Sequence, residues 1–176
     1  MGEVKMESKL VAEAIGTFAL TFIGAGAIIV GSLDGGSTPL LTVAMAHGLV
    51  LAVVVSATMS ISGGHINPAV TLAFLAIKKI DSTTAGAYIV AQLVGAVLAG
   101  GLLFTIYGEA NFGGTPAPGS IGGEALEPTQ VILVEVVLTF LLMFAAAAPA
   151  SLSQPRAPTS GGSGVQPPAS VASPTM

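Results

Sequence analysis

The chain has 176 residues, of which 52% are hydrophobic and only 8% are charged. A soluble domain carries roughly 25% charged residues, so lipid must solvate much of this surface and we predict an integral membrane protein. The formal net charge of −4 gives no basis for nucleic-acid binding, and the lack of cysteine excludes disulfides and thiolate metal sites within these residues.

Four apolar runs are long enough to cross a bilayer, which takes about 20 residues of helix. They are residues 10–33, 40–61, 85–106 and 131–148. Gly and Ala are frequent in all four, and small residues let helices approach closely in lipid. The sequence therefore predicts an all-α membrane protein with four transmembrane helices.

A fifth apolar segment, residues 68–77, is only about ten residues long, or roughly 15 Å as a helix. It follows residues 60–67, which are too polar and glycine-rich to stay helical in lipid. Length alone leaves two interpretations open, a re-entrant half-helix or a kinked full span.

The basic residues favour the half-helix, because cytoplasmic loops collect Lys and Arg. With the N-terminus cytoplasmic and residues 67–77 entering and leaving by one face, all five bases lie on the cytoplasmic side. These five are Lys5, Lys9, Lys78, Lys79 and Arg156. A full span would instead place Lys78 and Lys79 outside.

From residue 145 onward the composition changes to Ala, Pro, Ser and Gly without periodicity. Such a composition is typical of disordered segments. We therefore divide the chain into a membrane part, residues 1–144, and a low-complexity tail, residues 145–176, which we predict to be disordered.

An internal repeat relates the first and fourth spans. The pattern Glu-x-x-x-Thr-Phe-x-Leu-x-Phe occurs at residues 13–22 and again at 135–144. Three spans separate the starts of the two copies, so the second copy crosses the membrane in the opposite direction, as in inverted-topology repeats. Chance is a poor explanation, because a glutamate inside the membrane recurs at the same register.

Residues 62–71, Ser-Gly-Gly-His-Ile-Asn-Pro-Ala-Val-Thr, resemble the first Asn-Pro-Ala box of the aquaporin and glycerol-facilitator family. The flanks agree, with Ala12 and Glu13 in the first span and Tyr88, Gln92 and Gly95 in the third. The resemblance covers roughly residues 8–144. It implies an aquaporin-like half-fold, made of the first repeat and the start of an inverted second one. The family has six spans and two half-helices, so we expect a truncation after the fourth transmembrane helix.

The Asn-Pro-Ala box itself, Asn67, Pro68 and Ala69, suits the start of a helix. Asn is a favoured N-cap and Pro a favoured first helical residue. The Asn67 oxygen is expected to accept from the N–H of Ala69 or Val70, which leaves its NH₂ group as a donor in the lumen. That donor and the positive helix N-terminus would oppose protons and cations. The alternative is that Asn67 merely caps a helix.

Gly63, Gly64 and His65 precede this cap. Non-helical backbone at membrane depth survives only where it lines a wet cavity or is buried in protein. The resemblance implies that their carbonyl groups form a ladder of acceptors for water, and we expect the His65 carbonyl more than its ring to face the pore. The alternatives are glycine turns and a histidine ring that fixes the loop.

His47 lies twenty positions before Asn67. In the family that register supplies one wall of the narrow outer constriction, and histidine there resembles water-selective and vacuolar-type members. The alternative is an interhelical hydrogen bond.

Three further polar residues of the spans, Glu13, Gln92 and Glu135, are candidates for bracing the re-entrant loops, since a carboxylate in lipid needs donors. The resemblance implies that these donors are backbone N–H groups. As a residue of the second repeat, Glu135 is expected to brace the loop around Asn67. Glu13 is expected to serve the second loop and therefore to lack a partner. The alternative for all three is bonding between helices.

The function predicted from these features is a passive channel for water and small neutral solutes, with no enzyme activity, metal or cofactor. Its partners are the lipid bilayer, the permeating solute and, for a full-length chain, the family's homotetramer. One alternative is a non-conducting fragment without the second Asn-Pro-Ala half. Another is an intramembrane hydrolase using Ser60 or Ser62 with His47 or His65, although neither serine lies in a complete nucleophile elbow, Gly-x-Ser-x-Gly.

Overall fold

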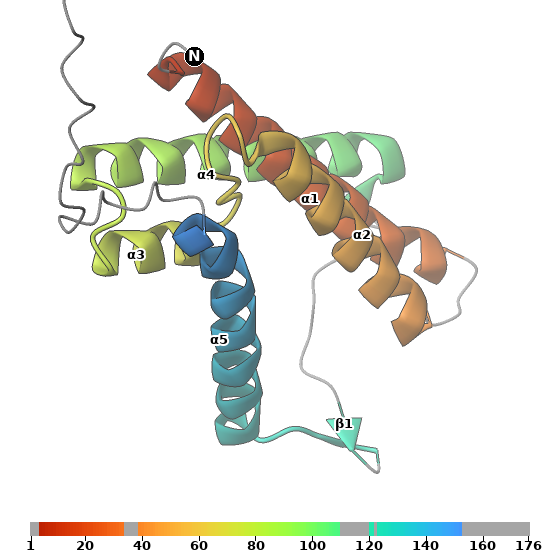
Figure 1. Cartoon of the computed structure of the whole chain (residues 1–176). Coiled ribbons are helices and arrows are strands. Elements are labelled where there is room, and N and C mark those ends of the chain that lie inside the picture. Colours follow the sequence, from red (N-terminus) through yellow and green to blue (C-terminus); the bar gives the residue numbers. More distant parts are fainter. Residues whose placement is uncertain (1–3, 34–38, 110–119, 122, 153–176) are drawn as a thin grey trace, which may run out of the picture. The chain divides into compact units, whose positions relative to one another are not determined.

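A computed structural model describes residues 4–33, 39–109, 120–121 and 123–152. The helices are α1 (Met6–Ser32), α2 (Leu40–Thr58), α3 (Pro68–Ala76), α4 (Ser82–Tyr107) and α5 (Pro128–Leu152) (Figure 1). Two short strands, β1 (Ser120–Ile121) and β2 (Glu124–Ala125), pair antiparallel between α4 and α5. Four of these helices, all except α3, are long and apolar enough to cross a membrane. The predicted all-α membrane fold is confirmed.

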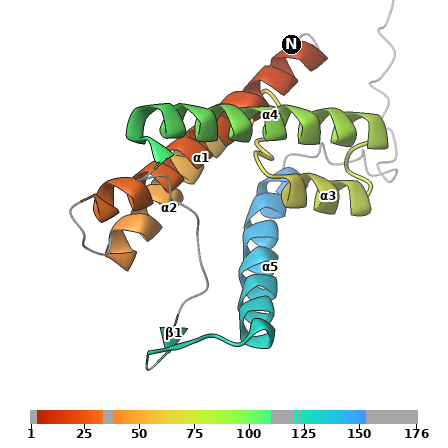
Figure 2. The ribbon, with the colours of Figure 1, turned by 180° about the vertical axis from the view of Figure 1, so that it is seen from behind.

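The chain forms two compact units, residues 1–135 and 136–176. Within the first, α1 packs against both α2 and α4, and α3 packs against the beginning of α4 (Figures 1 and 2). Most large apolar side chains of α1, α2 and α4 are exposed, whereas the buried set includes Glu13, Thr17, Thr71 and Gln92. This distribution suits a lipid-facing surface with a polar interior.

Close contact between α1 and α4 depends on Gly95. A Cβ atom at this position would collide with the backbone carbonyl of Ala14 in α1. The two helix backbones therefore approach each other more closely than any other residue would allow, as is common for small residues at helix interfaces in membranes. This contact brings the middle of α4 next to the first third of α1.

The half-helix α3 has defined ends. Asn67 caps its beginning, and Pro68 is its first residue. At its end Lys78 adopts a left-handed backbone (φ 57°), and the N–H of Lys79 donates to the Phe74 carbonyl at 2.9 Å. This hydrogen bond closes the helix in a Schellman-type turn, after which the chain reverses into α4. A nine-residue helix agrees with the predicted half-length segment; its orientation toward the membrane stays a prediction.

The C-terminal boundary differs from the prediction. The fourth span was expected to give way to a disordered tail at residue 145, but α5 continues to Leu152. Four consecutive alanines, residues 145–148, have the highest helix propensity and favour continuation of the helix past Phe144, where the membrane part was predicted to end. The rest of the predicted tail, including Arg156, lies outside the described residues.

Candidate functional site

The loop between α2 and α3 follows an irregular backbone path. Gly63 and Gly64 have φ angles of 93° and 63°, which glycine adopts without strain. Ile66 also has a positive φ, of 55°, although a β-branched residue rarely adopts this conformation. Such a loop needs anchors outside its own segment.

The principal anchor is Glu13 of α1, whose side chain is fully buried. Its Oε1 accepts hydrogen bonds from the Ser62 hydroxyl (2.6 Å) and the His65 N–H (3.0 Å). Its Oε2 accepts from the Ile66 N–H (2.6 Å) and from Gln92 Nε2 of α4 (2.7 Å). Four donors therefore surround the two carboxylate oxygens, and all four are neutral hydroxyl, amide or backbone N–H groups.

Gln92 extends this network from α4 to α3. Its Nε2 also donates to Thr71 Oγ1 at 3.0 Å. The amide must present its NH₂ group to Glu13, because an oxygen there would face a carboxylate oxygen. The Oε1 of Gln92 is buried and, within the described part of the chain, has no hydrogen-bond partner.

Thr71 also fixes the tautomer of His65. Its hydroxyl donates to the Asn67 carbonyl at 3.2 Å and lies 3.1 Å from His65 Nδ1. Since the single hydroxyl hydrogen points to Asn67, the proton between the threonine and the histidine is best placed on Nδ1. The threonine thus connects α3 to the loop and, through Gln92, to α4.

The His65 ring lies inside the protein. It stacks on Phe74 at 4.6 Å between ring centroids and meets Tyr88 edge-on at 5.3 Å. The Tyr88 hydroxyl donates to the Ser62 carbonyl at 2.8 Å, which adds a second connection from α4 to the loop. The ring therefore holds the loop in place, as the alternative interpretation of His65 proposed.

Asn67 forms the N-cap that its residue type predicted. Its Oδ1 accepts from the Ala69 N–H at 2.7 Å, so the side-chain NH₂ group is turned away from the helix. Asn67 is half-buried, and its NH₂ group makes no hydrogen bond to the residues that the structure describes. A free pair of donors therefore stands at the N-terminus of α3.

His47 lies in α2, eleven residues before the end of that helix at Thr58. Its Nδ1 hydrogen-bonds to the Val43 carbonyl within α2 at 2.9 Å, so Nε2 remains as the acceptor. The ring fills the space beside Gly24 of α1, where a Cβ atom would collide with it. This hydrogen bond lies within α2, and among the described residues His47 makes no hydrogen bond to another helix, although the alternative interpretation had expected one. A constriction role stays a prediction.

The assignments of the two glutamates to their loops were wrong. Glu13 was expected to lack a partner, but it has four; the loop around Asn67 was assigned to Glu135, but Glu13 occupies those N–H groups. Glu135 is exposed in α5. The reason is that α1 packs directly beside the loop of its own repeat, so the glutamate and the loop of one repeat meet.

Ser62, Thr17, Ile66 and Thr71 were not recognised from the sequence as members of this network. Thr17 and Glu13 are four residues apart in the repeated pattern and so lie on one helix face, which could have indicated a joint role. The other three carried no signal beyond their place in the family box.

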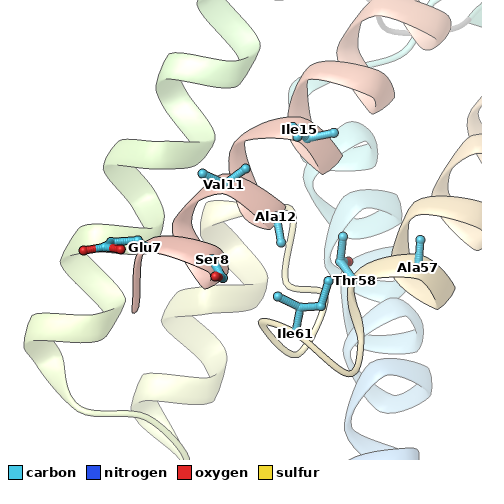
Figure 3. A pocket seen from close by; sticks show the side chains of 8 residues that line it. All are labelled: Glu7, Ser8, Val11, Ala12, Ile15, Ala57, Thr58 and Ile61. Atoms are coloured by element: carbon cyan, nitrogen blue, oxygen red, sulfur yellow. The ribbon is translucent and has the colours of Figure 1, made fainter. Parts of the chain in front are cut away.

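A separate open groove of about 490 Å³ lies between the N-terminal part of α1 and the end of α2. Figure 3 shows Ala12 of α1, Thr58 of α2 and Ile61 of the loop among the residues that line it. Its remaining lining residues are Glu7, Ser8, Val11, Ile15 and Ala57. The surface of this groove is mainly apolar.

Comparison with known proteins gives a consistent result. The sequence model of the family described as "Major intrinsic protein" matches residues 1–166. The chain is 36% identical over 144 residues to a putative aquaporin NIP4-1 of Arabidopsis thaliana, covering 80% of this chain and 48% of that protein. It is 38% identical over 138 residues to nodulin-26 of Glycine max (77% and 48%) and 43% identical over 141 residues to aquaporin TIP4-4 of Zea mays (77% and 54%). The chain thus spans about half the length of the curated relatives it matches.

Proposed function

Since this chain belongs to the major intrinsic protein family, we propose that it forms half of the wall of a passive channel for water and small neutral solutes. It is an integral membrane protein with four helices long enough to span the bilayer. The aquaporins of this family are channels and not enzymes. A hydrolase is therefore not proposed.

The observation that supports the channel is the free NH₂ group of Asn67. Because Oδ1 is used by the Ala69 N–H, the side chain can offer only donors to a passing molecule. A water molecule held by donors through its oxygen cannot accept a proton from the next water molecule. The positive end of α3 adds a barrier to cations at the same place.

The 176 residues alone are expected not to conduct. Among the residues that the structure describes, α3 is the only short half-length helix, and it supplies one capped N-terminus. A pore between two repeats needs an opposing wall, and in its absence the irregular loop would meet lipid or an open cleft. The non-conducting alternative is therefore our expectation for this chain when it is isolated.

Stopped-flow shrinkage of vesicles tests both statements. Vesicles with the 176-residue chain should shrink no faster than empty vesicles, whereas a chain extended by the second half of nodulin-26 should raise water flux with a low activation energy. In the extended chain, Asn67→Asp should increase proton leak in a pH jump by about tenfold or more, since it replaces the donor by a negative charge. An unchanged proton leak at normal water flux would rule out the role of Asn67.

The orientation of the chain is a second proposal. The exposed residues Lys78 and Lys79 should lie on the cytoplasmic side together with Lys5 and Lys9. Single cysteines at positions 78 and 79, on this cysteine-free background, should react with an impermeant maleimide only after the membrane is opened. The matched control is Glu124→Cys in the exposed strand β2, which should react in sealed cells. Reaction at position 78 in sealed cells would contradict the re-entrant topology.

A further inference from the structure

The residue before Asn67 is held in an unfavourable conformation. Ile66 has φ 55°, and its side chain is 1% exposed. A β-branched residue in the left-handed region is strained, and such strain persists only where the surroundings over-determine the backbone. Asn67 itself then follows with an ordinary extended backbone, φ −151° and ψ 129°.

Three neighbouring residues of α1 hold Ile66. Glu13 accepts its N–H at 2.6 Å, and the hydroxyl of Thr17 lies 3.0 Å from its carbonyl oxygen. Gly16 leaves room for its side chain, because a Cβ atom there would lie 2.9 Å from Ile66 Cγ1. Since positions i, i+3 and i+4 share one helix face, a single surface of α1 contacts the backbone on both sides of Ile66 and its side chain.

Of these contacts, the hydrogen bond from the Thr17 hydroxyl acts most directly on Asn67. The Ile66 carbonyl belongs to the planar peptide group that joins Ile66 to Asn67, so fixing it fixes the direction in which Asn67 begins. The Thr17 hydroxyl also lies 2.9 Å from the Glu13 carbonyl. That carbonyl is inside the helix, where the backbone of α1 supplies another donor. The group that depends on the hydroxyl is therefore the Ile66 carbonyl.

We propose that Thr17 and Gly16 are positioning residues for Asn67: they keep Ile66 left-handed, and so aim the side chain that caps α3 and leaves its NH₂ group free. This inference deepens the proposed function and rests on it for the meaning of the free NH₂ group. The geometry of the cap can be measured without any transport assay.

Hydrogen exchange of the Ala69 amide in nanodiscs measures this geometry, because that amide donates to Asn67 Oδ1. Thr17→Val removes the hydroxyl at nearly constant shape and should speed exchange about tenfold, whereas Thr17→Ser should change it less than threefold. Thr21→Val is the matched control, since Thr21 lies one turn further along α1 and makes no described hydrogen bond to the loop. Equal exchange rates at Ala69 in Thr17→Val and Thr21→Val would overturn the proposal.

A double-variant cycle separates positioning from general loss of stability. With Ile66→Gly the left-handed backbone is unstrained, so adding Thr17→Val should then change Ala69 exchange less than threefold. The same tenfold effect in both backgrounds would contradict the proposal. The amide of Ala99, buried in α4, should keep its exchange rate in every variant that remains folded.

The fit between Gly16 and Ile66 gives a further test that does not depend on Thr17. Gly16→Ala should displace the Ile66 side chain and speed hydrogen exchange of the Ala69 amide. Adding Ile66→Ala to that variant should restore the protection of this amide, because the smaller side chain makes room for the added methyl group. Failure of the second substitution to restore it would contradict the role of Gly16. Absence of water flux in an extended chain would affect the proposed function and leave these exchange results as they are.

Discussion

Replacing Glu13 with alanine is expected to release the loop before α3 and to lower the free energy of unfolding by about 3–5 kcal/mol. The carboxylate is the common acceptor for two backbone N–H groups, the Ser62 hydroxyl and the Gln92 amide, all in a buried setting. Each donor left without a partner costs about 1–3 kcal/mol, and water that enters the cavity recovers part of this sum.

Equilibrium unfolding of the purified chain in mixed micelles, followed by circular dichroism, measures this effect. The control is Glu7→Ala, which removes an exposed glutamate from the same helix and should change stability by less than about 0.5 kcal/mol. If the two variants lose similar stability, the four hydrogen bonds do not hold the loop as described.

Gly95→Val is expected to separate α4 from α1 and to destabilise the chain by about 3 kcal/mol or more. The first added carbon already collides with the Ala14 carbonyl, which belongs to a helix backbone and cannot rotate away. Valine is no worse than glycine as a helix former, so the loss comes from the interface and not from helix propensity. Because Gln92 lies one turn before Gly95, the same displacement would withdraw its amide from Glu13.

Gly100→Val is the matched control on α4, since no atom lies within 4 Å of the Cβ that it would add. The same unfolding experiment should show nearly unchanged stability for this control, whereas Gly95→Val should unfold at a lower denaturant concentration. Comparable stability of the two variants would mean that α1 and α4 can separate without loss, contrary to the close packing.

Parts of this architecture were readable from residue type and length. Apolar runs predicted the spans, the ten-residue length of the fifth apolar segment predicted a short helix, and Asn before Pro predicted the cap at Asn67, since each depends on local chemistry. The partner of Glu13 was not readable, because the repeat shows two equivalent glutamates and only the packing of α1 decides which loop each one meets.

Ile66 is the clearest case of tertiary structure overriding local preference. Its β-branched side chain favours extended backbone, so no sequence argument would place it left-handed. The conformation follows from the combined contacts with Glu13, Gly16 and Thr17, which are fifty or so positions away in the chain. These contacts exist only once α1 has packed beside the loop.

The four donors around Glu13 also impose an order on biosynthesis. Ser62 follows Glu13 by 49 residues and Gln92 by 79, so at a synthesis rate of about 5–20 residues per second the carboxylate waits about 4–16 s for its last donor. A bare charge inside a span opposes insertion by up to about 3 kcal/mol. The first helix therefore enters the bilayer as an incomplete unit. Its carboxylate gains the last of the four donors only when α4, the third long helix, packs against α1.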